Sequence, residues 1–159
     1  MHSITYKTEI IRKMGSIIDE NCFYVDLEYC IFPLQFIHNF VCLNFPVYQY
    51  LLGSATQSMN MNNLIIRRDQ HLKVVIRLVN FYEDSKHKLN KKILNIIKTR
   101  LKCVAFQQYL IYLNMNPKEV LPEIICFDKW LKNDHQIYIR GQKESSSWCC
   151  SGSNRKCSC

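Results

Sequence analysis

The cations between residues 86 and 102 are the side chains whose types and spacing most directly suggest a chemical role. Seven of the chain's 21 lysines and arginines lie there, no acidic residue occurs from Lys86 to Lys118, and the chain as a whole carries a net charge of +8. The seven are Lys86, Lys88, Lys91, Lys92, Lys98, Arg100 and Lys102. Such a row attracts acidic macromolecules, and on nucleic acid it displaces counterions from the phosphates. We therefore predict that these residues bind an acidic macromolecule, which is nucleic acid or an acidic protein.

All but one of these cations are lysines. An ammonium group suits diffuse attraction to phosphates better than the paired hydrogen bonds by which arginine reads a base. None of the common nucleic-acid-binding modules can be recognised in the sequence. The expected contact is therefore with the nucleic-acid backbone, without strong sequence preference. Two alternatives stay open: the row lies on an anionic membrane, or it is only the solvated face of a helix.

The end of the chain holds the other distinctive pattern, four cysteines around a basic pair. The cysteines are Cys149, Cys150, Cys157 and Cys159, and the basic pair is Arg155 and Lys156. The terminal Cys-x-Cys resembles the doubly prenylated end of Rab-type small GTPases, and the adjacent cysteines resemble acylation sites, so the resemblance implies lipidation of these cysteines. It covers the tail alone, because the chain lacks the phosphate-binding loop of a GTPase. Two lipid chains and two cations would hold the protein on a membrane.

Sequence motifs of catalysis and cofactor binding are missing. The four glycines are isolated, so neither G-x-G-x-x-G nor the G-x-x-x-x-G-K phosphate loop occurs, and H-E-x-x-H and G-x-S-x-G are also absent. The tail cysteines lack the C-x2-C spacing that places two thiolates on one zinc ion. We therefore predict a non-enzymatic protein with no catalytic residues, no cofactor and no metal.

A long segment without charge follows Glu28. No Asp, Glu, Lys or Arg occurs between Glu28 and Arg67, and Cys30–Leu52 is long enough to cross a bilayer as a helix. Two prolines and several amides oppose a span, because each amide would need a partner in lipid. The favoured interpretation is a buried core element with a helix over residues 33–44. Its expected core stripe is Phe32, Phe36, Phe40 and Leu43. The alternative is a membrane-associated protein anchored by Cys30–Leu52, by the lipidated tail, or by both.

The remaining cysteines lie in apolar or helical surroundings. They are Cys22, Cys30, Cys42, Cys103 and Cys126. We predict them to be reduced and mostly buried, as expected of small apolar side chains in an intracellular protein. Residues 1–14 carry charges and no apolar run, so no secretory signal is expected. The expected location is the cytoplasm or nucleus, with membrane association as the alternative.

The scarcity of glycine and proline, four of each, favours a mostly α protein with few tight turns. Apolar residues recur every three to four positions over residues 8–18, 64–82, 86–114 and 117–132, and the third stretch predicts one long basic helix. For 64–82 a helix is favoured over a strand. The expected fold is a small irregular helical domain followed by a tail. Its parts are an apolar, charge-poor helical segment (1–52), a linker (53–63), a basic helical region with a short strand-like end (64–140, strand-like at 135–140), and a disordered Cys- and Ser-rich tail (141–159).

The composition leaves one further alternative open. Ile, Lys, Asn, Tyr and Phe, which are encoded by A/T-rich codons, make up 62 of the 159 residues. This composition indicates either a gene from an A/T-rich genome or an open reading frame with no selected function.

Overall fold

The computed structural model of the chain describes residues 3–15, 18–49 and 57–134, and within these ranges all regular structure is helical. The elements are α1 (Thr8–Met14), α2 (Asp26–Ile31), the 3-10 helix η1 (Phe32–Phe36), α3 (Met61–Ile66), α4 (Arg68–Ser85), α5 (Lys91–Leu113), α6 (Pro117–Lys129) and the π-helical turn η2 (Trp130–Asp134). This confirms the prediction of a small, mostly α domain with one long basic helix.

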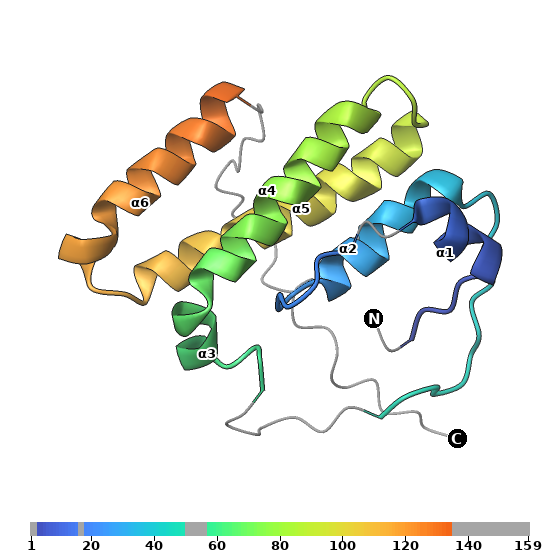
Figure 1. Cartoon of the computed structure of the whole chain (residues 1–159), viewed down its shortest axis with the longest axis horizontal. Helices are drawn as coiled ribbons and strands as arrows, with labels where there is room; N and C mark the ends of the chain where they lie inside the picture. The colour runs from blue at the N-terminus through green and yellow to red at the C-terminus, as the bar shows by residue number, and fades with distance from the viewer. Residues whose placement is uncertain (1–2, 16–17, 50–56, 135–159) are drawn as a thin grey trace.

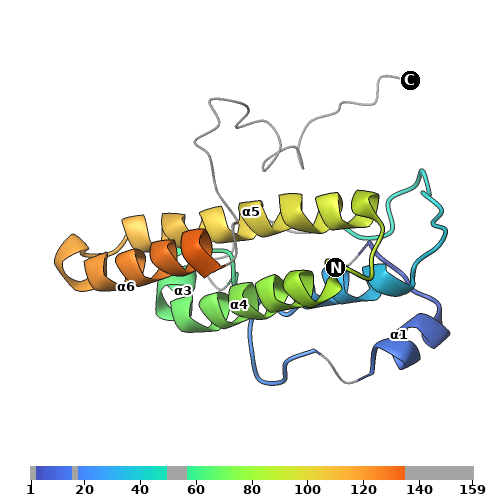
Figure 2. The same cartoon turned by 90° about the horizontal axis from the view of Figure 1, so that it is seen from above.

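The hairpin of α4 and α5 forms the centre of the molecule. The two helices lie side by side and antiparallel, α6 returns along them at one side, and α2 and α1 lie at the other side (Figure 1). Figure 2 shows that α5 and α1 occupy opposite sides of the molecule. One long side of α5 therefore faces away from the N-terminal helices.

The apolar core lies mainly between α4 and α5. Both helices place branched aliphatic side chains every three to four residues on their facing sides. The fully buried members are Val74, Val75, Leu78 and Val79 of α4 and Ile97, Leu101, Val104, Ala105 and Ile111 of α5. Burying one such larger side chain contributes about 1.5–3 kcal/mol, so this packing, rather than the cations, holds α5 in place.

Asparagine side chains fix where the last two long helices begin. The Asn90 side chain accepts the Lys92 N–H at 2.9 Å and starts α5, so the helix begins at Lys91 instead of the predicted residue 86, and residues 86–90 form a turn. Asn116 likewise accepts the Lys118 N–H at 3.1 Å and starts α6. A cap of this kind satisfies an amide that has no partner within the helix.

The predicted helix over residues 33–44 is wrong. Only the short 3-10 helix η1 forms there, and residues 37–49 have no helix. Asparagines and β-branched residues disfavour helix in this stretch, and Pro46 disfavours the helical conformation at Phe45, directly before it. The predicted core stripe is correct for Phe32, which is buried, but Phe40 and Leu43 are 83% and 62% exposed.

Other boundaries also differ from the sequence-based prediction. The first helix ends at Met14, because Gly15 adopts φ +70°, a left-handed conformation that glycine tolerates best. The expected linker 53–63 ends in helix, since the Asn60 side chain caps α3 from Met61. The helix favoured for 64–82 is confirmed, although it is divided at Arg67 into α3 and α4. The strand-like piece 135–140 and the tail 141–159 lie outside the described residues.

Polar contacts attach the N-terminal segment to α4. The Arg77 guanidinium contacts the Asp19 carboxylate and lies 3.6 Å from Glu28 Oε1, while Lys73 Nζ lies 3.0 Å from Asp19 Oδ2. The Asp19 N–H also donates to Glu28 Oε2 at 2.9 Å. Burial raises the pKa of the fully buried Glu28 carboxyl, and the Asp19 N–H and the Arg77 charge oppose that rise. A buried carboxylate is tolerated because it has such partners.

Candidate acidic-partner interface

The first turn of α5 concentrates positive charge. Lys91 and Lys92 are its first two residues, both are exposed, and this turn contains no acidic residue. The unpaired amides at a helix N-terminus carry about half a positive elementary charge. Lys88 is exposed in the turn just before it. The lysines therefore add to the positive end of the helix dipole instead of offsetting it, which favours contact with an anion.

One side of α5 carries three of the predicted lysines. Lys91, Lys98 and Lys102 are separated by seven and four residues, which places them on the same side of a helix with about 100° between residues. Lys91 and Lys102 are exposed, and Lys98 is half-buried. At a rise of about 1.5 Å per residue, they span roughly 16 Å along the helix.

The other two helical cations do not share that side. Lys92 lies about a quarter of a turn away, and Arg100 lies on the opposite flank. The outer side also changes character along the helix, because Phe106, Leu110 and Leu113 form an exposed apolar stripe in its second half. The structure thus brings three predicted cations into one row and distributes the rest around the first half of α5.

Lys86 lies apart from the predicted interface. It follows α4 in the turn, its ammonium group contacts the Glu83 carboxylate, and it lies 5.6 Å from the centroid of the Tyr82 ring. Glu83 and Lys86 have the i,i+3 spacing at which opposite charges pair at the end of a helix. Since its charge is neutralised locally, we leave Lys86 out of the interface.

The remaining six cations have no acidic partner among the described residues. No described carboxylate lies within 4.0 Å of their charged groups. They are Lys88, Lys91, Lys92, Lys98, Arg100 and Lys102. By contrast, Arg68, Lys73, Arg77 and Lys132 are all paired with carboxylates. Among the described residues, the positive charge of the α5 region is therefore not neutralised by carboxylates.

Two further features were not predicted from the sequence. The first is the exposure of the uncharged segment 40–48, and the second is a groove between α4 and α6. Four asparagine, proline and histidine residues between positions 38 and 46 were a signal against a core helix. The groove had no comparable signal, because its walls come from residues more than forty positions apart.

The five cysteines that were predicted to be reduced and mostly buried differ in their exposure. Within the described ranges none of them forms a disulfide; Cys22, Cys30 and Cys103 are half-buried, whereas Cys42 and Cys126 are exposed. The expectation that they are mostly buried is therefore wrong for the last two. The four cysteines of the predicted lipidation site, residues 149, 150, 157 and 159, lie outside the described residues.

The described residues contain neither a candidate membrane span nor a candidate metal site. Among these residues, no helix combines the length and apolar character needed to span a bilayer. Nor does any described group of three or more His, Cys, Asp or Glu side chains have an arrangement that could hold a metal ion.

Comparisons of the chain with protein-family models, curated proteins and solved structures gave no match. The function proposed below therefore rests on the geometry and charge of the chain itself.

Proposed function

We propose that this chain is a non-enzymatic interaction protein whose α5 region binds the phosphate backbone of nucleic acid. The observation that carries the proposal is the row of Lys91, Lys98 and Lys102 on one side of α5, without acidic partners among the described residues. Each lysine that neutralises a phosphate releases a counterion, so the binding is expected to weaken steeply with salt.

The arrangement favours backbone contact over base reading. Base-specific contacts usually come from bidentate side chains, and Arg100 is the one arginine of the set. It lies on the flank opposite the lysine row. The expected ligand is therefore nucleic acid of any sequence, with affinity determined by charge.

Fluorescence anisotropy with two labelled oligonucleotides of unrelated sequence tests this proposal. The test variant replaces Lys91, Lys98 and Lys102 by Glu. Between about 50 and 200 mM salt, loss of three phosphate contacts is expected to reduce the slope of log K against log salt by about 2.7, at about 0.9 per contact on duplex DNA. Circular dichroism checks that the helical content is unchanged.

The matched control replaces Lys7, Lys13 and Lys118 by Glu. These lysines are also exposed, and the change in net charge is the same. The proposal requires the control to keep most of the affinity that the test variant loses. Equal losses in both variants would show that only net charge matters, and affinity insensitive to salt in the unmodified chain would also refute the proposal.

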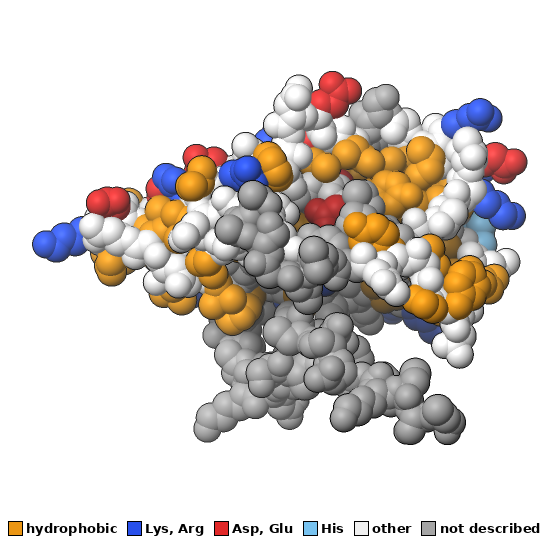
Figure 3. Space-filling view, turned by 90° about the horizontal axis from the view of Figure 1, so that it is seen from below, with side chains coloured by type: hydrophobic (Ala, Val, Ile, Leu, Met, Phe, Trp, Pro, Cys, Tyr) orange, Lys and Arg blue, Asp and Glu red, His pale blue; other side chains and the backbone are white. Residues whose placement is uncertain are grey.

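A second candidate, association with an anionic membrane surface, is favoured by the exposed segment 40–48. Phe40 and Val41 are each 83% exposed, Phe45 is 61% exposed, and no charged residue lies between Glu28 and Arg67. The segment rises at one end of the molecule to the level of α5, on the side opposite α1 (Figure 2), and apolar side chains gather at that end of the surface (Figure 3). Apolar insertion and cation attraction could thus act together.

Flotation with vesicles separates this candidate from the first. Vesicles with and without phosphatidylserine would be compared for the unmodified chain and for Phe40→Ser/Phe45→Ser. Ile66→Ser/Leu121→Ser serves as the control, because these two side chains are also exposed and lie elsewhere. Binding to anionic vesicles that is lost only in the first double variant supports membrane association. Absence of flotation with the unmodified chain excludes it.

A further inference from the structure

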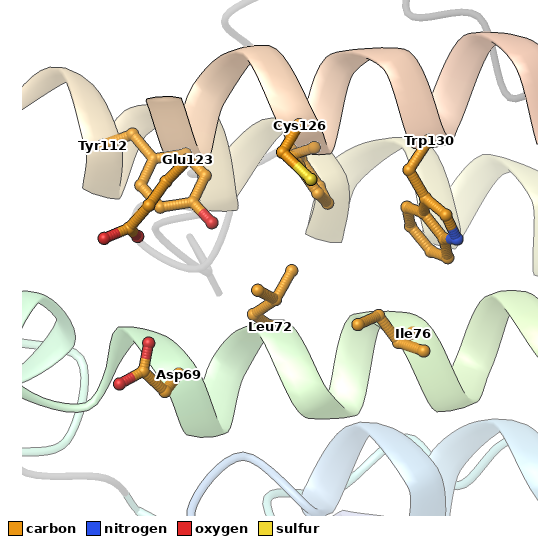
Figure 4. A pocket seen from close by; sticks show the side chains of 8 residues that line it. Asp69, Leu72, Ile76, Tyr112, Glu123, Cys126 and Trp130 are labelled. Atoms are coloured by element: carbon orange, nitrogen blue, oxygen red, sulfur yellow. The ribbon is translucent and has the colours of Figure 1, made fainter. Parts of the chain in front are cut away.

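A groove of about 420 Å³ lies between α4 and α6, away from the outer side of α5 (Figure 4). Its lining is mostly apolar or aromatic, with a thiol at the middle and two carboxylates at one end. The lining residues are Asp69, Leu72, Ile76, Tyr112, Glu123, Cys126, Phe127 and Trp130. A volume of this size is in the range of sites for small organic ligands.

Three helices build the apolar part of the groove. Leu72 and Ile76 come from α4, and Trp130 follows α6 on the facing wall. Tyr112 of α5 and Phe127 of α6 are almost completely buried, with ring centroids 6.0 Å apart, so they provide a fixed inner surface. Leu72, Ile76 and Trp130 are only half-buried, which leaves their outer parts available to a ligand.

The charged end of the groove contains more negative than positive charge. Arg68 donates to both oxygens of Glu123, each at 3.3 Å, and so links α4 to α6, while its Nε lies 3.9 Å from Asp69 Oδ1. One guanidinium thus faces two carboxylates, and it lies closer to Glu123 than to Asp69. The Asp69 side chain remains 79% exposed to solvent. This end is therefore net negative in a protein whose net charge is +8.

We propose that the groove binds a small amphipathic amine. The apolar or aromatic body of the ligand lies against Leu72, Ile76 and Trp130, and its ammonium group lies at the Asp69 end. Charge complementarity selects a cation here, since an anionic head group would meet two carboxylates and only one guanidinium. The proposal is independent of nucleic-acid binding, because it uses a different surface and the opposite charge.

Dansylcadaverine is a suitable probe, because it joins a fluorescent aromatic body to a primary amine. Dansyl butylamide supplies a neutral counterpart, and dansyl-6-aminohexanoate supplies an anionic one. We expect a saturable blue shift of the dansyl emission, with the amine binding more tightly than the neutral analogue and the anion binding least. Asp69→Asn is expected to weaken amine binding about two- to fivefold, the range typical of an exposed ion pair.

A pair of tryptophan substitutions on α6 tests the location. Cys126→Trp places a large ring inside the groove at an already exposed position, and Leu121→Trp adds the same ring at an exposed position that does not line it. Binding should disappear in the first variant and persist in the second, with circular dichroism unchanged in both. Binding that persists in Cys126→Trp, or no saturable binding to the unmodified chain, refutes the groove as a site.

The thiol gives a second readout that needs no substitution. Saturating dansylcadaverine should slow alkylation of Cys126 while leaving alkylation of the exposed Cys42 unchanged, as measured by peptide mass spectrometry. Equal protection of both thiols, or none, contradicts the proposed position. If the groove binds the anionic probe as tightly as the amine, the assigned ligand class is wrong.

Discussion

Reversing one charge at the start of α5 should make the protein more stable and weaken the proposed binding to nucleic acid. Lys92 is the second residue of α5, and its N–H donates to the Asn90 side chain at 2.9 Å. Its ammonium group therefore lies at the positive end of the helix dipole, where a cation is unfavourable. In Lys92→Glu, a carboxylate takes that place and the dipole stabilises it.

The expected size follows from the dipole interaction. A charge near a helix end contributes about 0.3–1 kcal/mol. The reversal removes an unfavourable term and adds a favourable one, so the free energy of unfolding should rise by about 1 kcal/mol at low salt. For a chain of this length, that corresponds to an increase in Tm of about 2–4 °C. The gain should shrink at high salt, because the site is exposed and screened.

Lys118→Glu is the positional control. Lys118 is the second residue of α6, it is exposed, and its N–H donates to the Asn116 side chain at 3.1 Å. This control should also raise Tm, although less, since Glu119 already lies in that first turn. Lys118 is not part of the α5 row, so nucleic-acid affinity should change little.

Thermal unfolding and anisotropy on the same protein samples provide the decisive comparison. For Lys92→Glu we expect a higher Tm together with a salt slope smaller by at most about 0.9, because Lys92 lies about a quarter of a turn from the lysine row and makes at most one phosphate contact on duplex DNA. A lower Tm would show that Lys92 makes a stabilising contact in place of the dipole repulsion described above. Equal loss of affinity in the two variants would refute the assignment of binding to α5.

Three further predictions concern the core and the exposed segment. Arg77→Met should lower the free energy of unfolding at pH 7 by about 3–5 kcal/mol, because it leaves the buried Glu28 carboxylate without its cation. Urea titration measures this loss, and a loss below about 1 kcal/mol would contradict the prediction. Burial lowers the pKa of His71, so stability present above about pH 6.5 should fall as the pH decreases, and His71→Gln should flatten that dependence. Phe40→Ser/Phe45→Ser should change the unfolding free energy by less than about 0.5 kcal/mol, since both side chains are exposed; a larger loss would mean that the segment packs in solution.

The sign of the His71 prediction follows from its surroundings. The ring has no exposed surface, its Nδ1 lies 2.6 Å from Gln108 Oε1, and the Tyr24 ring meets it edge-on at 5.2 Å. Desolvation opposes protonation more than the contacts with Gln108 and Gln107 favour it. As the pH falls, His71 is therefore protonated in the unfolded chain before it is protonated in the folded chain. The free energy of unfolding decreases over the pH range between the pKa of the unfolded state and the lower pKa of the folded state.

The long helices were predictable because their evidence is local. In α4, α5 and α6 the apolar residues recur at helical spacing, and Asn116 followed by Pro117 marks the start of α6 directly. The start of α5 was missed because the apolar spacing alone does not locate the Asn90 side chain as the cap, and the helix begins only after it, at Lys91.

The segment after η1 shows where local evidence fails. Phe40 and Leu43 continue a helical stripe that begins with Phe32, and a stripe of this kind is usually buried. Burial, however, requires a partner surface, and α2 and α5 already pack against part of α4. The spacing of the apolar residues does not show which surface remains for the segment to pack against.

The candidate interface was predictable in composition and not in geometry. The absence of acids from Lys86 to Lys118 identified the cations, but only the helix bounds show that Lys91, Lys98 and Lys102 share a side. The Glu83–Lys86 pair was recognisable from its spacing. The groove was not, because Leu72 and Cys126 become neighbours only when α6 folds back along α5.

The cations of α5 can be changed without endangering the fold, because the two properties depend on different sides of the helix. Ile97, Leu101 and Val104 hold α5 against α4 from the buried side. Lys91 and Lys92 add positive charge to a helix end that is already positive, so they lower stability there. Lys98 differs from them because it lies outside the first turn and is half-buried. The stability of the Lys92→Glu variant therefore tests the dipole argument, whereas the proposed binding of an external anion is tested by the anisotropy measurement on the same variant.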